Sequence, residues 1–214
     1  FRFDLFKKIK KQIYWYFFEK KNLLSSKSIL LTSEVEKNLL NKSFVNTTGL
    51  KKNVVNYGIL KPNKNKKKAV KIFLKRHPKL KKKSFLIYLG RFHKKKGCDI
   101  LLKSVKILND QNIKLNLFMA GPENEYKNYL KKICEKLKIK NQIYWSSMLK
   151  GYEKWGAIYS SKAMVLASHG ENFGLSLVES LSCSKPVLIT NKVNIYKSII
   201  KSKSGLVAKD NVKD

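Results

Sequence analysis

A short apolar segment, a glycine-containing turn and a second apolar segment follow one another between residues 162 and 183. Residues 162–167 are typical of a buried strand in a parallel sheet. Residues 168–174 form a turn, and Leu175, Val178 and Leu181 recur at helical spacing, which predicts a helix over 175–183 with these three side chains inward. A strand, turn and helix in this order leave free backbone N–H groups at the helix start, where an anion can bind.

The same alternation extends over most of the second half of the chain. Apolar runs predict strands at 85–89, 115–119, 143–145, 162–167 and 187–190, and amphipathic segments predict helices at 98–108, 125–137, 153–160 and 175–183. Strands and helices that alternate with short connections predict a doubly wound, Rossmann-like parallel sheet of the α/β class. Segments that directly follow strands should then meet in one crevice at the carboxyl edge of the sheet, namely 90–91, 120–121, 146–147 and 168–174.

Residues 1–60 are predicted to be part of another domain, and residues 61–214 to form the domain just described. The first part is expected to contain helices at 9–24 and 34–40, the second capped by Thr32 or Ser33, and strands at 28–31 and 54–55. The lysine-rich stretch 61–83 is expected to be solvated linker and helix. The aromatic run 14–18 is more typical of a core; because Lys7, Lys8, Lys10 and Lys11 precede it, contact with an anionic bilayer is the alternative.

The net charge of +33 comes from 44 lysines and only three arginines. A site built to bind phosphates or guanines in nucleic acid favours arginine, whereas an excess of lysine is typical of AT-rich coding sequences. We therefore expect no nucleic-acid partner, although a basic nucleic-acid-binding protein is the alternative function. Cys98, Cys134 and Cys183 lack any C-x-x-C spacing, which argues against disulfides and zinc and favours a reducing, cytoplasmic location.

Acidic residues are scarce around the turn at 168–174. Glu171 and Glu179 are the only acids between Lys154 and Lys209. Glu171 lies in the turn and Glu179 about five residues into the helix, roughly 7–8 Å along its axis. Carboxylates accept strong hydrogen bonds from neutral hydroxyls, so the pair suits a sugar-like ligand beside a bound anion. Two solvated surface glutamates are the alternative interpretation.

These residues resemble the retaining nucleotide-sugar glycosyltransferases of the GT-B fold. The resemblance rests on the seven residues between the two glutamates, on Asn172-Phe173-Gly174 and on Pro186. Residues 88–92 with Lys96-Gly97 resemble the phosphate-binding element of that family, and residues 118–122 resemble its next strand and turn. The resemblance implies that 61–214 is the C-terminal, nucleotide-sugar-binding domain and 1–60 a remnant of the acceptor-side domain. Ser184 stands where the family often has glycine, which predicts a strained turn.

The resemblance also assigns roles to individual residues. Two cations would neutralise the donor diphosphate, assisted by backbone N–H groups at the helix start: Arg91 and Lys96, with Phe173, Gly174 and Leu175. Glu171 would be the catalytic residue that holds the sugar hydroxyls, Glu179 would bind the ribose, and Ser147 and Met148 would lie near the nucleobase.

The implied activity is transfer of a sugar, with retention, to a glycan or lipid-linked acceptor in polysaccharide or cell-envelope synthesis. No Asp-x-Asp occurs, so we expect no metal and no cofactor besides the nucleotide-sugar donor. The expected location is cytoplasmic, peripheral at the inner face of the membrane. Because family members are considerably longer and this chain begins with Phe1, we expect a fragment that is inactive alone, and a non-catalytic donor-binding fragment is the remaining alternative.

Overall fold

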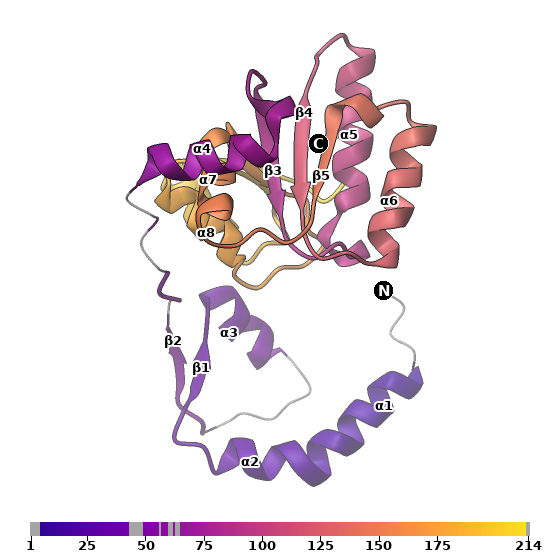
Figure 1. Ribbon diagram of the computed structural model, residues 1–214. Helices are drawn as coiled ribbons and strands as arrows, with labels where there is room; N and C mark the ends of the chain where they lie inside the picture. Colours follow the sequence, from indigo (N-terminus) through magenta and orange to yellow (C-terminus); the bar gives the residue numbers. More distant parts are fainter. Residues whose placement is uncertain (1–4, 43–48, 56, 60–61, 63–64, 213–214) are drawn as a thin grey trace. The chain divides into compact units, whose positions relative to one another are not determined.

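The fold is that of a computed structural model, which describes residues 5–42, 49–55, 57–59, 62 and 65–212 (Figure 1). The chain forms two compact units, Phe1–Gly58 and Ile59–Asp214. The assignment of the first unit to an acceptor-side domain stays a prediction.

The first unit contains a long helix and a small parallel sheet. The helix runs through α1 (Leu5–Tyr14), a π-helical turn (Trp15–Glu19) and α2 (Lys20–Leu24). Strand β1 (Ile29–Leu31) pairs in parallel with β2 (Lys52–Val54), and α3 (Glu34–Asn41) lies between them in the chain. The Ser33 hydroxyl accepts a hydrogen bond from the Glu36 N–H at 3.1 Å, so Ser33 rather than Thr32 caps α3.

The prediction that residues 14–18 belong to a core is wrong for the described structure. Tyr14, Tyr16, Phe17 and Phe18 are 55%, 65%, 70% and 61% exposed. Only Trp15 of this run is partly covered. Burial of aromatic side chains is favourable, so an aromatic run is typical of a core. Burial also requires a neighbouring surface, and the sequence of the run does not show whether one is present.

The second unit is built on a six-stranded sheet in which all strands are parallel. Its strands are β3 (Phe85–Leu89), β4 (Asn116–Ala120), β5 (Ile143–Ser146), β6 (Ala163–Leu166), β7 (Val187–Thr190) and β8 (Gly205–Ala208). Their order in the sheet is β5-β4-β3-β6-β7-β8. The chain enters the sheet in the middle at β3, runs through β4 to the edge at β5, and then fills the other side with β6, β7 and β8. The predicted doubly wound sheet is therefore confirmed, with β8 as a strand that the sequence patterns did not predict.

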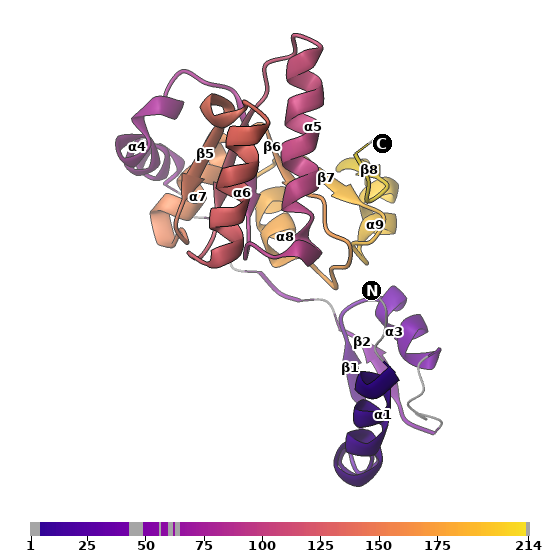
Figure 2. The same cartoon turned by 90° about the vertical axis from the view of Figure 1, so that its right-hand side faces the viewer.

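Helices connect the strands and cover both faces of this sheet. They are α4 (Lys66–Arg76), α5 (Cys98–Asp110), α6 (Glu125–Lys136), α7 (Gly151–Ser160), α8 (Leu175–Ser182) and α9 (Tyr196–Lys201). Figure 1 shows α5 and α6 on one side of the sheet and α4, α7 and α8 on the other, and Figure 2 shows β8 at the sheet edge beside α9. The four helices and five strands predicted between 85 and 190 are confirmed to within about two residues.

Helix α4 departs from the expected solvated segment. Ala69 and Phe73 are fully buried, and a Cβ added at Gly156 of α7 would lie 2.1 Å from the Ala69 carbonyl oxygen. The two helices therefore pack backbone against backbone, and the lysines of α4 occupy only its outer side.

The predicted inward face of α8 is wrong in part, although Leu181 packs against the core as expected. Leu177 and Ser180 are fully buried, whereas Leu175 is 51% exposed. Gly174, at φ +75°, starts the helix in a left-handed conformation, and the Leu177 side chain folds back over it. In an eight-residue helix with apolar residues on several sides, docking onto the sheet decides the inward face, and spacing alone does not.

The strained turn predicted at Ser184 is confirmed. Ser184 follows α8 with φ +57°, in the left-handed region that glycine prefers. Its N–H donates to the Leu181 carbonyl at 2.9 Å, and the Lys185 N–H donates to the Ser180 carbonyl at 3.0 Å. These two reversed hydrogen bonds define a Schellman motif.

Candidate functional site

A pocket of about 210 Å³ lies at the carboxyl ends of β3, β4 and β5. We call it the strand-end pocket; its lining residues are Leu89, Gly90, Arg91, Ala120, Gly121, Pro122, Met148, Leu149, Lys154 and Glu179. The segments after these three strands therefore converge as expected for a doubly wound sheet, joined by one residue each from α7 and α8. The expected single crevice is confirmed only in part, because residues 146–147 and 168–174 do not line this pocket.

Close backbone contacts build this pocket. The Gly90 N–H donates to the Ala120 carbonyl at 3.1 Å, and a Cβ added at Gly121 would lie only 2.0 Å from the Gly90 carbonyl oxygen. Only glycine at position 121 allows the two loops to approach so closely. The buried Tyr88 hydroxyl donates to the Arg91 carbonyl at 2.7 Å. Because burial raises the pKa of Tyr88, the hydroxyl keeps the proton that it donates.

The pocket contains charges of both signs. Arg91 is exposed, and its guanidinium has no hydrogen-bond or ion-pair partner within the described residues. Glu179 of α8 pairs with Lys154 of α7, with 2.6 Å between Oε1 and Nζ. Both side chains of this pair are about one quarter exposed. The pocket therefore combines an unpaired cation with a carboxylate that keeps one oxygen outside its ion pair.

A second polar cluster forms where the start of α5 meets the loop after β6. Gly97, at φ +62°, caps α5, and a Cβ there would lie 1.8 Å from the Ala167 carbonyl oxygen. The Ser168 hydroxyl and the His169 N–H both donate to the Lys95 carbonyl at 2.9 Å. The turn that carries Lys96 is therefore held directly against the loop that carries Glu171.

Lys96 and Glu171 form an ion pair between Nζ and Oε2, and both side chains are largely buried. The Glu171 backbone is held from both sides, because its N–H donates to the Lys192 carbonyl at 3.0 Å and its carbonyl accepts from the Asn194 N–H at 2.9 Å. This bridge fixes the position from which the carboxylate projects, and its Oε1 lies outside the ion pair with Lys96.

Helix α8 connects the two clusters. Gly174 lies beside the Glu171 side chain, since a Cβ added there would lie 3.5 Å from Glu171 Cγ. Glu179 lies about five residues further on, roughly 7.5 Å along the axis. The predicted residues thus separate into two groups: Arg91, Met148 and Glu179 line the strand-end pocket, whereas Lys96, Glu171, Phe173, Gly174 and Leu175 lie outside its lining. Ser147 is exposed and is also outside the lining.

Two lysines that sequence reasoning missed support this region. Lys154 lines the pocket and holds Glu179. Lys127 of α6 is 1% exposed, and its Nζ donates to the carbonyl of Ser146, the last residue of β5, at 2.8 Å. It thereby fixes the strand end from which the loop with Met148 leaves. Among 44 lysines, nothing in the sequence distinguishes these two.

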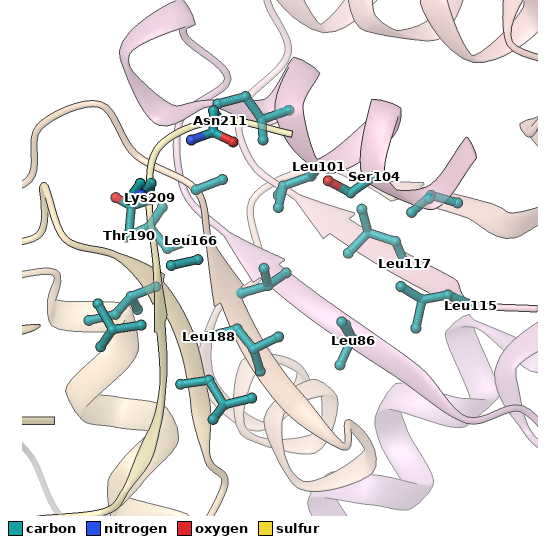
Figure 3. Close-up of a pocket in the computed structure, with 18 of the residues that line it drawn as sticks. Leu86, Leu101, Ser104, Leu115, Leu117, Leu166, Leu188, Thr190, Lys209 and Asn211 are labelled. Carbon is teal, nitrogen blue, oxygen red and sulfur yellow. The ribbon is translucent and has the colours of Figure 1, made fainter. Parts of the chain in front are cut away.

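A larger apolar groove, of about 420 Å³, lies elsewhere, between α5 and the strands β3, β4, β6, β7 and β8 (Figure 3). Its walls are mostly leucine, isoleucine and valine, with Ser104, Thr190, Lys209 and Asn211 as its polar members. None of the predicted site residues lines it.

Two features concern the described part of the chain as a whole. Within residues 5–42, 49–55, 57–59, 62 and 65–212, no helix is long and apolar enough to cross a membrane. Cys98, Cys134 and Cys183 are buried free thiols, as expected.

Known proteins share both the sequence pattern and the fold. Residues 69–214 match the family described as glycosyl transferases group 1. An uncharacterized glycosyltransferase of Methanocaldococcus jannaschii is 28% identical over 120 residues, which are 55% of this chain and 31% of that protein.

Among solved structures, the sucrose-phosphate synthase of Thermosynechococcus elongatus matches with a TM-score of 0.73 at 17% identity, over 90% of this chain and 47% of that one. WaaG, a glycosyltransferase involved in lipopolysaccharide biosynthesis, matches with 0.72 at 16%, over 84% and 48%. HepE of Anabaena, solved with UDP and glucose, matches with 0.71 at 15%, over 86% and 50%. The chain thus has the GT-B type of fold and spans about half the length of these three structures. Because the family match covers more than half of its residues, the chain belongs to the group 1 family of glycosyl transferases.

Proposed function

We propose that this chain is the donor-binding part of a retaining glycosyltransferase, which moves a sugar from a nucleotide diphosphate to a glycan or lipid-linked acceptor. The observation that carries the proposal is the strand-end pocket, where Arg91 of the β3 loop and Glu179 of α8 line one cavity. A cation and a carboxylate at this edge of a doubly wound sheet suit a phosphorylated, hydroxyl-bearing ligand. HepE, which shares the fold, was solved in complex with UDP-glucose.

In this proposal, Arg91 and Lys96 bind the diphosphate. Its negative charge grows as the bond to the sugar breaks, so nearby cations stabilise the transition state more than the bound donor. The backbone N–H groups of Phe173, Gly174 and Leu175, where the turn leads into α8, add a positive helix end on the same side. The group-transfer step breaks the bond between the anomeric carbon and the diphosphate oxygen, and the diphosphate leaves with the bonding electrons. The acceptor hydroxyl oxygen forms the new bond to the anomeric carbon on the same face, and its proton passes to the departing diphosphate.

The two glutamates would hold hydroxyl groups with their second oxygens. Lys154 pairs with Oε1 of Glu179, which leaves Oε2 to accept from a ribose hydroxyl. Lys96 pairs with Oε2 of Glu171, which leaves Oε1 for the sugar hydroxyls that position the anomeric carbon. Met148 lines the pocket and would lie near the nucleobase; Ser147 keeps that role only if its loop moves inward on binding.

The wider assignments also belong to this proposal. The reaction would need no metal and no cofactor besides the donor, because Arg91, Lys96 and the start of α8 supply the positive charge. The protein would act in polysaccharide or cell-envelope glycan synthesis, in the cytoplasm and at the inner face of the membrane. Residues that bind the acceptor would come from outside the described second unit.

Calorimetry with UDP, GDP and uridine, each with and without EDTA, tests the donor site. We expect diphosphate binding that survives EDTA. Arg91→Ala should weaken it by about 1.5–3 kcal/mol, roughly 10-fold to 150-fold, and leave uridine binding nearly unchanged. Arg76→Ala is the matched control, because Arg76 pairs with Glu153 and does not line the strand-end pocket. Equal losses for UDP and uridine would refute the diphosphate role, and binding that vanishes with EDTA would refute metal independence.

The glutamates are separated by a second experiment. Glu179→Gln should reduce the preference for UDP over 2′-deoxy-UDP, because the amide is a weaker acceptor for a ribose hydroxyl. Glu171→Gln should lower turnover of the longer enzyme more than donor affinity. If the Glu179→Gln variant keeps the wild-type preference for UDP over 2′-deoxy-UDP, the ribose role is wrong. If the Glu171→Gln enzyme has normal turnover, the catalytic role is wrong.

A further inference from the structure

The long helix of the first unit has an apolar stripe that the described residues leave uncovered. Phe6, Ile9, Ile13 and Phe17 are spaced by three or four residues, so they lie along one side. They are 84%, 46%, 53% and 70% exposed. Four large apolar side chains in line on one helix form a contiguous exposed patch, which isolated exposed residues do not.

Another side of the same helix is less exposed. Trp15, Glu19 and Leu23, each four residues from the next, are partly covered, whereas their neighbours Tyr16, Phe17 and Phe18 are exposed. The covered side and the apolar stripe are therefore different faces. The stripe can therefore contact another surface without involving the side that carries Trp15 and Leu23.

The charge of the helix indicates which kind of surface the apolar stripe contacts. Between residues 5 and 24 there are six lysines and one acid, Glu19. The lysines are Lys7, Lys8, Lys10, Lys11, Lys20 and Lys21. A second copy of the same helix would meet it with like charge, which disfavours a dimer through this face. An anionic lipid surface accepts both features, because the lysines meet headgroups and the apolar stripe enters the acyl boundary.

The aromatic residues also match a lipid interface. Tyr14 and Tyr16 are exposed beside the stripe, and the Lys20 ammonium lies 5.0 Å from the centre of the Tyr16 ring. Tyrosine has an apolar ring and a polar tip, which suits the boundary between headgroups and acyl chains.

We propose that the helix over 5–24 lies flat on an anionic bilayer, with Phe6, Ile9, Ile13 and Phe17 inserted and its lysines on the headgroups. This makes specific the peripheral membrane contact within the proposed function. The surface itself does not depend on the strand-end pocket, so it can fail or succeed separately from donor binding.

Co-sedimentation of the 214-residue chain with vesicles tests the proposal. We expect binding to vesicles with about 30% phosphatidylserine and little binding to pure phosphatidylcholine, with affinity that falls as salt rises. Phe6→Ser, Ile13→Ser and Phe17→Ser together should abolish binding. The matched control is Ile107→Ser, Ile113→Ser and Ile200→Ser, which removes three exposed apolar side chains outside this helix. Circular dichroism of both variants checks that each stays folded.

A charge-reversal pair tests the electrostatic part without removing apolar surface. Lys7→Glu with Lys10→Glu should weaken binding to anionic vesicles about 30-fold or more, whereas Lys67→Glu with Lys71→Glu on α4 should change it far less. Equal binding to neutral and anionic vesicles would overturn the proposal, as would equal losses in the control variants. Unchanged vesicle binding by the variant with serine at positions 6, 13 and 17 would also overturn it. Dimerisation through this helix, or a preference for RNA over vesicles, would do the same. UDP binding by the variant with serine at positions 6, 13 and 17 shows whether the donor site is intact when membrane binding is lost.

Discussion

Four helices of the second unit end in the same strained way. α5, α6, α8 and α9 are each followed by a non-glycine residue in the left-handed region, with φ between +50° and +61°. These residues are Asn112, Lys138, Ser184 and Lys203. In each case two reversed hydrogen bonds close a Schellman motif, whose strained position most often holds glycine.

Replacing Ser184 with glycine should therefore stabilise the fold. Removing the Cβ relieves about 1–2 kcal/mol of left-handed strain. The unfolded chain gains freedom that offsets about 0.4–1 kcal/mol of this. Ser184 is exposed, so the substitution loses no buried contact. The net gain should be about 0.5–1 kcal/mol, which corresponds to a rise in Tm of about 1–4 °C in a domain of this size. Lys138→Gly should gain as much and Asn112→Gly less, because asparagine tolerates this conformation.

Urea denaturation of the 214-residue chain, followed by circular dichroism, measures the change. Lys132→Gly is the matched control for Lys138→Gly, since it makes the same substitution six residues earlier, at an exposed position inside α6. There glycine should cost about 0.5–1 kcal/mol. The reasoning is refuted if Ser184→Gly leaves the midpoint unchanged or lowers it, or if Lys132→Gly and Lys138→Gly change it in the same direction.

Three further predictions concern the core of the second unit. Gly97→Ala should destabilise it by about 2 kcal/mol or more, because the new Cβ would collide with the Ala167 carbonyl at positive φ; an unchanged Tm would contradict this. Lys127→Met should cost about 1–3 kcal/mol, because the Ser146 carbonyl loses its shorter hydrogen bond and keeps only the 3.4 Å bond from the Gly121 N–H, and a urea midpoint equal to wild type would count against that contact. Burial raises the pKa of Cys98 from 9.0 to about 11, so its thiol should react with DTNB at pH 8 only on unfolding, and its contribution to stability should be lost as pH rises from about 9 toward 11.

The sequence by itself determined the regular elements of the second unit. Five apolar runs became adjacent parallel strands, since a short apolar segment between turns satisfies both its hydrogen bonds and its burial only inside a sheet. The need for glycine at 97 and 121, in contrast, comes from tertiary contacts, because the backbone of a distant segment lies too close to each for a Cβ. The convergence of the loops after β3, β4 and β5 then followed from parallel topology alone.

Tertiary structure decided what lies between these elements. β8 has only four residues and begins with a glycine, and α9 has only six, so they form only where β7 and the sheet edge provide a partner. The inward face of α8 depends on how Leu177 docks, and the exposure of Phe17 depends on whether a neighbour covers it. Lys96 meets Glu171 and Lys154 meets Glu179 because the fold brings separate loops together. Local pattern reports the conformation of a few consecutive residues, whereas the choice of partner among 44 lysines depends on contacts between residues far apart in the chain.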